Sequence, residues 1–121
     1  MRMLILVGFG SFLGGISRYL TSQLIQTRFI SAFPYGTLAV NIIGCLLIGL
    51  IIGWNEKFSL SSEWRLFLAT GLCGGFTTFS AFSAETLLLM RSGQFLYAIT
   101  YISVSVLSGI VATFIGASIF K

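Results

Sequence analysis

Hydrophobic residues run along this chain in four long stretches that short polar segments separate. The stretches cover about residues 3–25, 35–54, 64–90 and 94–120. Each is longer than the ~18 apolar residues that indicate a helix crossing the hydrocarbon core of a bilayer. The pattern therefore predicts an all-α integral membrane protein, with four transmembrane helices that form a single domain over residues 1–121.

The segments between the stretches have the composition of turns. They read QTRFISAFP, NEKFSLSSE and RSGQ, and Pro34, the only proline, stands where the second helix is expected to begin. Arg2 before an apolar run is also typical of a secretory signal. No small-residue cleavage pattern follows it, and three more apolar stretches do, so residues 3–25 are predicted to be the first membrane helix.

Composition narrows the function classes. Of the 121 residues, 56% are hydrophobic and 8% are charged, against about 25% charged residues in soluble domains. The chain has no histidine, three acidic residues and no glycine loop of the phosphate-binding kind, and its two cysteines fall in different helices, where packing is their usual role. An enzyme is therefore not expected, nor is a nucleic-acid partner. A pore, a transporter or an accessory subunit remains.

The basic residues divide almost evenly between the two sides of the membrane. With four spans, both termini share one side with the middle connection, and the counts are four against three: Arg2, Lys57, Arg65 and Lys121 against Arg18, Arg28 and Arg91. A clear bias would fix one orientation. Near balance predicts insertion both ways up, with opposite copies paired as an antiparallel dual-topology dimer. The alternative is that such small counts carry no signal.

Glycines four residues apart occur in two helices. Gly10 and Gly14 have this spacing in the first, and Gly49 and Gly53 have it in the second. Small residues at this spacing let helix backbones approach closely in lipid. We expect them to serve dimerisation, although glycine is common in membrane helices and the signal is weak.

Polar residues inside the stretches recur on single helix faces. The sets are Ser11, Gly15, Arg18 and Ser22; Thr37, Asn41 and Gly44; and Tyr97, Tyr101, Ser105 and Ser108. A lone hydroxyl often bonds its own helix, but an amide near mid-membrane is costly without partners, so Asn41 is expected to line a path rather than only join helices. Arg18 either reaches the headgroups or attracts anions from a vestibule. Seven basic against three acidic residues favour an anion path.

The third stretch contains GLCGGFTTFSAFSAE, residues 71–85, in which a helix break is expected at Gly74 and Gly75. The threonines next to them compete with regular helix bonds. Backbone groups freed at membrane depth must find partners, and unwound carbonyls from two copies would suit one small cation. Beyond the break, Phe79 and Phe82 share a face. Aromatic edges carry positive partial charge, which favours a small anion.

The segment GGFTTFSAFSAE, together with NIIGCLLIG in the second helix, resembles the Fluc (CrcB) family of fluoride channels, and the resemblance extends over essentially the whole chain. It implies antiparallel dual-topology dimers with two pores that pass fluoride passively out of the cell across the cell membrane and relieve its toxicity. It also implies a sodium ion at the dimer centre that is structural and not transported.

Residue by residue, the resemblance assigns the sodium-binding backbone carbonyls to Gly74 and Thr77, the pore rings to Phe79 and Phe82, the pore amide to Asn41 and the vestibule cation to Arg18. Thr37 joins this pore set from its place on the face of Asn41. Ala81 stands where the family often has threonine, which makes the hydroxyl assignments less secure. Those hydroxyls are Ser80, Ser83, Tyr101, Ser105 and Ser108.

Two other functions stay open at this point. A small multidrug exporter also has four helices and dual topology, but it needs a membrane-embedded carboxylate in its first helix, and residues 3–25 contain none. An accessory subunit of a larger complex would need neither polar stripes nor a hydroxyl-rich break. Glu85, the only acid that falls well inside a stretch, is expected to pair with an arginine near a pore mouth.

Overall fold

The computed structural model describes residues 1–120, and within them four helical spans are long and apolar enough to cross a membrane. They are α1 (Arg2–Arg28), α2 (Tyr35–Phe58), a composite third span over Ser62–Arg91, and α6 (Phe95–Ser118). The prediction of an all-helical, four-span membrane protein is confirmed. The first three spans run a few residues further than predicted because they continue into polar flanks such as residues 55–58, whereas α6 begins one residue later and ends two residues earlier than predicted. Lys121 lies outside the described residues.

The third span consists of several segments. It begins with α3 (Ser62–Arg65), continues as the π-helix η1 (Leu66–Cys73) and the single turn α4 (Gly74–Phe76), and resumes after two extended residues as α5 (Phe79–Arg91). The extended residues are Thr77 (φ −93°, ψ 158°) and Thr78 (φ −151°, ψ 118°). A break in this span is confirmed, but its expected position at the glycines is wrong, because Gly74 is helical (φ −62°, ψ −39°).

Glycines bring α1 against the third span. A Cβ atom added to Gly10 would lie 2.6 Å from the carbonyl oxygen of Phe67, and one added to Gly75 would lie 2.6 Å from that of Ser11. Real Cβ atoms do not approach a backbone oxygen so closely. Of the two glycines after Cys73, Gly75 therefore permits the contact with α1. The backbone leaves the helical conformation at Thr77, two residues after Gly75.

The second glycine pair has the same use in another helix contact. A Cβ atom at Gly53 would lie 2.6 Å from the carbonyl oxygen of Ala117, and Gly49 meets the backbone of Thr113. These glycines let α2 pack along α6. The expectation that the four-residue glycine spacings serve dimerisation is therefore wrong: both surfaces are covered by helices of the same chain.

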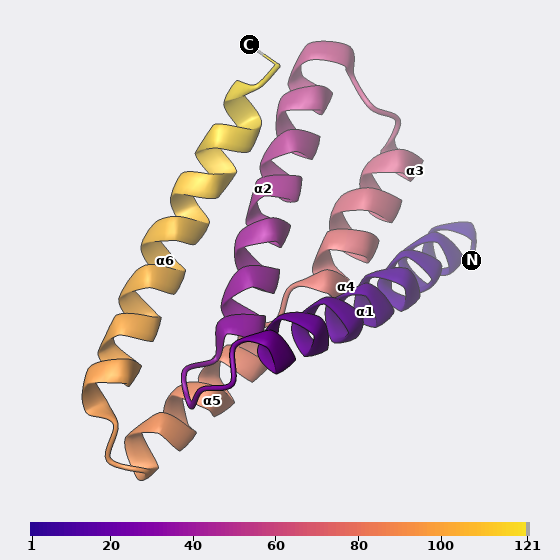
Figure 1. The fold of residues 1–121 in the computed structure, drawn as a ribbon. Helices are drawn as coiled ribbons and strands as arrows, with labels where there is room; N and C mark the ends of the chain where they lie inside the picture. The colour runs from indigo at the N-terminus through magenta and orange to yellow at the C-terminus, as the bar shows by residue number, and fades with distance from the viewer. Residues whose placement is uncertain (121) are drawn as a thin grey trace.

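Figure 1 shows how the spans are arranged. Helices α2 and α6 lie side by side, α1 crosses obliquely and packs on η1 and α4, and α5 turns beneath α2 to contact α6. The α2–α3 connection and the end of α6 lie at one end of the bundle, and the other two connections lie at the opposite end. Arg2 Nε lies 2.9 Å from Glu63 Oε2, which ties the start of α1 to α3.

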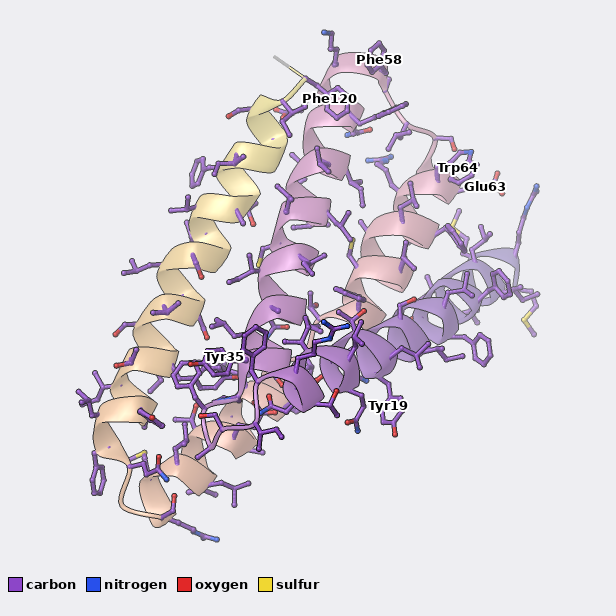
Figure 2. The ribbon with its side chains drawn as sticks, in the orientation of Figure 1. Tyr19, Tyr35, Phe58, Glu63, Trp64 and Phe120 are labelled. Atoms are coloured by element: carbon purple, nitrogen blue, oxygen red, sulfur yellow. The ribbon has the colours of Figure 1, made fainter. Side chains whose placement is uncertain are left out.

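Aromatic side chains gather at both ends of the bundle. Figure 2 shows Phe58, Trp64 and Phe120 near the α2–α3 connection and Tyr19 and Tyr35 near the opposite end. Aromatic residues favour the two membrane–water boundaries, where an apolar ring meets water. With large apolar side chains exposed along every span, this distribution is that of a multi-pass membrane protein.

Candidate functional site

The break in the third span leaves backbone groups without their helical partners, and Asn41 of α2 takes up two of them. Its Oδ1 accepts a hydrogen bond from the Thr78 N–H at 3.0 Å, and its Nδ2 donates to the Thr78 carbonyl at 3.2 Å. Asn41 thus forms an interhelical clamp. Its amide carries two N–H donors, so one remains for the cavity that the residue lines.

Arg18 of α1 takes up a third freed group. Its Nε donates to the Gly75 carbonyl at 3.2 Å, in a half-buried position. The residues after Phe76 are extended, so the helix ends there. The Gly75 carbonyl therefore lacks the hydrogen bond that the N–H four residues later would donate in a continuous helix. Arg18 therefore turns toward the break instead of reaching along the surface. A guanidinium has five N–H donors, and Arg18 lines a cavity together with Glu85.

The carbonyls of Gly74 and Thr77 lack the partners that a continuous helix would give them. Those partners would be the N–H groups of Thr78 and Ala81, which bond instead to Asn41 Oδ1 and to Thr78 Oγ1. Within residues 1–120 no group of three or more histidine, cysteine or acidic side chains gathers to hold a metal. The two carbonyls of Gly74 and Thr77 are oxygen donors, and oxygen donors are the ligands that small hard cations prefer.

A cavity of about 440 Å³ lies beside the break and opens to one face of the chain. Phe79 is 78% exposed there, and its ring centroid lies 5.6 Å from that of Phe82, which in turn lies 5.0 Å from that of Tyr101. Ser105 Oγ lies in the same wall and is buried with no hydrogen-bond partner in the described part of the chain. The cavity thus combines ring faces and edges with uncommitted donors.

A second cavity of about 150 Å³ adjoins the break at Thr78 and is also lined by Arg18, Ser22, Thr37 and Glu85 among others. Glu85 accepts hydrogen bonds from Thr37 Oγ1 at 2.7 Å and from the Tyr101 hydroxyl at 3.0 Å. The expected arginine partner of Glu85 is wrong, since over residues 1–120 the ion pair formed is that of Arg2 with Glu63. Thr37 and Tyr101 are buried and turned to this carboxylate.

The remaining predicted hydroxyls differ in their surroundings. Ser80 Oγ lies 3.2 Å from Thr78 Oγ1 on an exposed surface, and Ser83 is exposed. Ser108 Oγ donates to the carbonyl of Val104 in its own helix. None of these three lines either cavity. Sequence reasoning did not include Glu85 in the pore set, although an acid within an apolar stretch is a signal by itself.

Comparison with known proteins gives one consistent result. The family described as "CrcB-like protein, Camphor Resistance (CrcB)" matches residues 5–117. A Flavobacterium psychrophilum protein named "Fluoride-specific ion channel FluC" is 48% identical over 100% of this chain and 98% of its own length. Proteins of the same name from Bacteroides fragilis (43% identical, over 96% of this chain and 94% of their own) and Oceanobacillus iheyensis (44%, over 96% and 89%) are also similar.

Proposed function

Because this chain belongs to the CrcB-like protein family, we infer that it is a fluoride-selective ion channel of the cell membrane, which passes fluoride passively and lowers its toxicity in the cytoplasm. The observation that carries this function is the 48% identity, over the whole chain, to a protein named as a fluoride-specific channel. Conduction of an ion needs no catalytic group, so the activity is that of a channel and not of an enzyme.

The two cavities supply what a small anion needs when it leaves water. Stripping hydration from a charge is costly unless other donors replace the water molecules. In the smaller cavity the guanidinium of Arg18 offers charge and N–H donors. In the larger one Asn41 retains an N–H and Ser105 a hydroxyl, and the edges of Phe79 and Phe82 carry positive partial charge.

We propose further that two copies assemble as an antiparallel homodimer. The larger cavity opens on a face where Phe79 is 78% exposed, so a single chain leaves this side of the path uncovered. A second copy inserted the other way up would cover it, and the nearly even division of basic residues permits both orientations.

The proposed dimer also accounts for the carbonyls of Gly74 and Thr77. Two from each copy would bring about four oxygens to the dimer centre, a donor set suited to a small hard cation such as sodium. We propose that a sodium ion holds the two breaks together as a structural element and is not transported. Gly74 and Thr77 would hold the ion. Their carbonyls are available because the N–H groups that would bond them in a continuous helix bond side-chain oxygens instead.

Fluoride efflux from liposomes tests the function directly. Purified protein is reconstituted with potassium fluoride inside, a potassium ionophore is added, and a fluoride electrode records release. We expect release much faster than from protein-free liposomes, and no comparable release of chloride from matched vesicles. Fluoride release at the protein-free rate would overturn the proposed function.

A further inference from the structure

Thr78 lies where the two cavities meet. It lines the larger cavity with Asn41 and the two pore rings, and it lines the smaller one with Arg18 and Glu85. It is the one residue common to both linings within residues 1–120. The two cavities therefore adjoin at Thr78, and an anion that moves directly from one to the other would pass this residue.

The main chain of Thr78 is fixed from α2. Both its N–H and its carbonyl bond the Asn41 amide, at 3.0 and 3.2 Å. A pair of bonds from one rigid amide to one residue sets both the position and the orientation of that peptide segment. Thr78 is consequently held in place although its backbone is extended (φ −151°, ψ 118°) and belongs to no helix.

The side chain of Thr78 fixes the start of α5. Its Oγ1 accepts from the Ala81 N–H at 3.1 Å, which makes Thr78 the N-cap of this helix. Phe79 is the first residue of α5 and Phe82 lies one turn later, so the cap sets where both rings stand. The hydroxyl proton is shared with Ser80 Oγ at 3.2 Å, where either oxygen can donate. It is therefore not committed to a backbone acceptor.

We propose that Thr78 is a further positioning and specificity-determining residue of the fluoride path, which caps α5 beneath the rings and donates its hydroxyl proton to fluoride at the junction of the two cavities. This inference rests on the proposed function. A hydroxyl has one donor and two acceptor positions, so it can accept from Ala81 and donate to an anion at the same time. Arg18 attracts the ion, and Thr78 passes it to the side of Asn41 and the rings.

The test compares Thr78→Ser, which keeps the hydroxyl, with Thr78→Val, which keeps the shape and removes it. Thr86→Val is the matched control, because Thr86 Oγ1 bonds only the Phe82 carbonyl of its own helix in the described structure. Three quantities are measured: fluoride efflux from liposomes, the ratio of fluoride to chloride efflux, and hydrogen–deuterium exchange of the peptide that covers residues 79–84.

We expect Thr78→Ser and Thr86→Val to stay within about twofold of wild-type efflux, since neither removes a hydrogen bond to the ion. Thr78→Val should slow fluoride efflux by roughly tenfold or more, the factor that a lost hydrogen bond to a charged group carries. It should also lower the fluoride-to-chloride ratio. The rate of hydrogen–deuterium exchange at the start of α5 should rise about fivefold in Thr78→Val, the factor expected for loss of a typical N-cap, and should not rise in the other two variants.

Wild-type efflux and an unchanged fluoride-to-chloride ratio in Thr78→Val would overturn the inference, and so would equal losses in Thr78→Ser and Thr78→Val. If Thr78→Val does not yield folded protein, Thr78→Ala removes the same hydroxyl with less bulk and decides the same question. Should wild-type liposomes release no fluoride, the proposed function fails. The exchange comparison still decides whether Thr78 fixes α5.

Discussion

Alanine substitutions at the two adjacent glycines of α4 separate packing within the chain from packing between chains. Both residues are helical, but they face different surroundings. A Cβ atom at Gly74 would have the Ala69 carbonyl oxygen, at 3.8 Å, as its nearest neighbour. A Cβ atom at Gly75 would lie 2.6 Å from the carbonyl oxygen of Ser11 and 2.9 Å from its Cα.

The stability difference between the two variants can be worked from these distances. Each alanine gains helix propensity of up to ~1 kcal/mol over glycine, and this gain cancels in the comparison. Gly75→Ala must also move the backbone of α1, and overpacking of this kind costs about 1–3 kcal/mol. For a chain of this size, the midpoint of thermal unfolding should then be roughly 4–12 °C lower in Gly75→Ala than in Gly74→Ala.

The assay measures helix content on heating in detergent, and size-exclusion chromatography and fluoride efflux report on assembly and function. Gly74→Ala should unfold at or slightly above the wild-type temperature. It should nevertheless lose dimer and efflux, because the second copy is proposed to pack on this face and the carbonyls of this face are proposed to bind sodium. Gly75→Ala should show its main defect in unfolding temperature.

Two results would refute this reasoning. Equal unfolding temperatures for the two variants would mean that Gly75 does not support the contact between α4 and α1. Wild-type dimer content and efflux in Gly74→Ala would mean that Gly74 does not face a second copy, and the cation proposal would lose its place in the molecule.

Three further predictions concern the rings, the cation and the topology. Phe79→Ile and Phe82→Ile keep an apolar side chain but remove the polarised ring edge, so fluoride efflux should fall severely while the protein is still purified as a dimer. Wild-type efflux in these variants would mean that both rings serve only in packing. Replacing sodium by a large organic cation on both sides of the liposome membrane should slow or stop fluoride efflux. Restoring sodium should recover efflux, whatever the direction of a sodium gradient. Full activity after thorough removal of sodium contradicts a structural sodium ion. A reporter fused to the C-terminus should appear on both sides of the membrane. Two or three lysines added within residues 55–63, where α2 ends and α3 begins, should bias the chain toward one orientation; a single orientation of the unmodified chain excludes the antiparallel homodimer.

The four spans were predictable because a bilayer imposes one strong requirement, an apolar length of helix, that any sequence displays directly. The presence of a helix break in the third span was predictable from the sequence, but its position was not. A glycine in a helix indicates either a bend in the chain or a close contact with a neighbouring backbone. The contact of Gly75 with Ser11 shows that the close contact is the reason here. The extended residue Thr78 is held instead by the side chain of Asn41 from another span, while Thr77 bonds back to the Cys73 carbonyl.

The partners of polar groups were the least predictable part of the site. Helical spacing shows that Thr37 and Asn41 share a face, but it does not show what that face meets. Thr37 meets the carboxylate of Glu85, 48 positions along the chain, and Asn41 meets Thr78, 37 positions along. Such pairs depend on the rotation and depth of whole helices, which are set by packing that a single sequence does not display.

The π-helical segment η1 determines where the third span can change its length. Bonds from each residue to the fifth along spread one turn over more residues than an α-helix does. Loss of one residue from Leu66–Cys73 would let the segment close into ordinary α-helical turns, with every backbone bond restored. Because the wider turns of a π-helix hold about one residue more over the same rotation, the rest of the span would keep nearly its present orientation.

Gly75 would then stay against α1, and Phe79 would stay beside its cavity. The consequence is evolutionary: descendants of this gene can gain or lose codons in the polar connections. The segment η1 is a further place where a single codon can be lost, whereas the same loss within α5 would rotate the residues beyond it by about 100° around the helix axis.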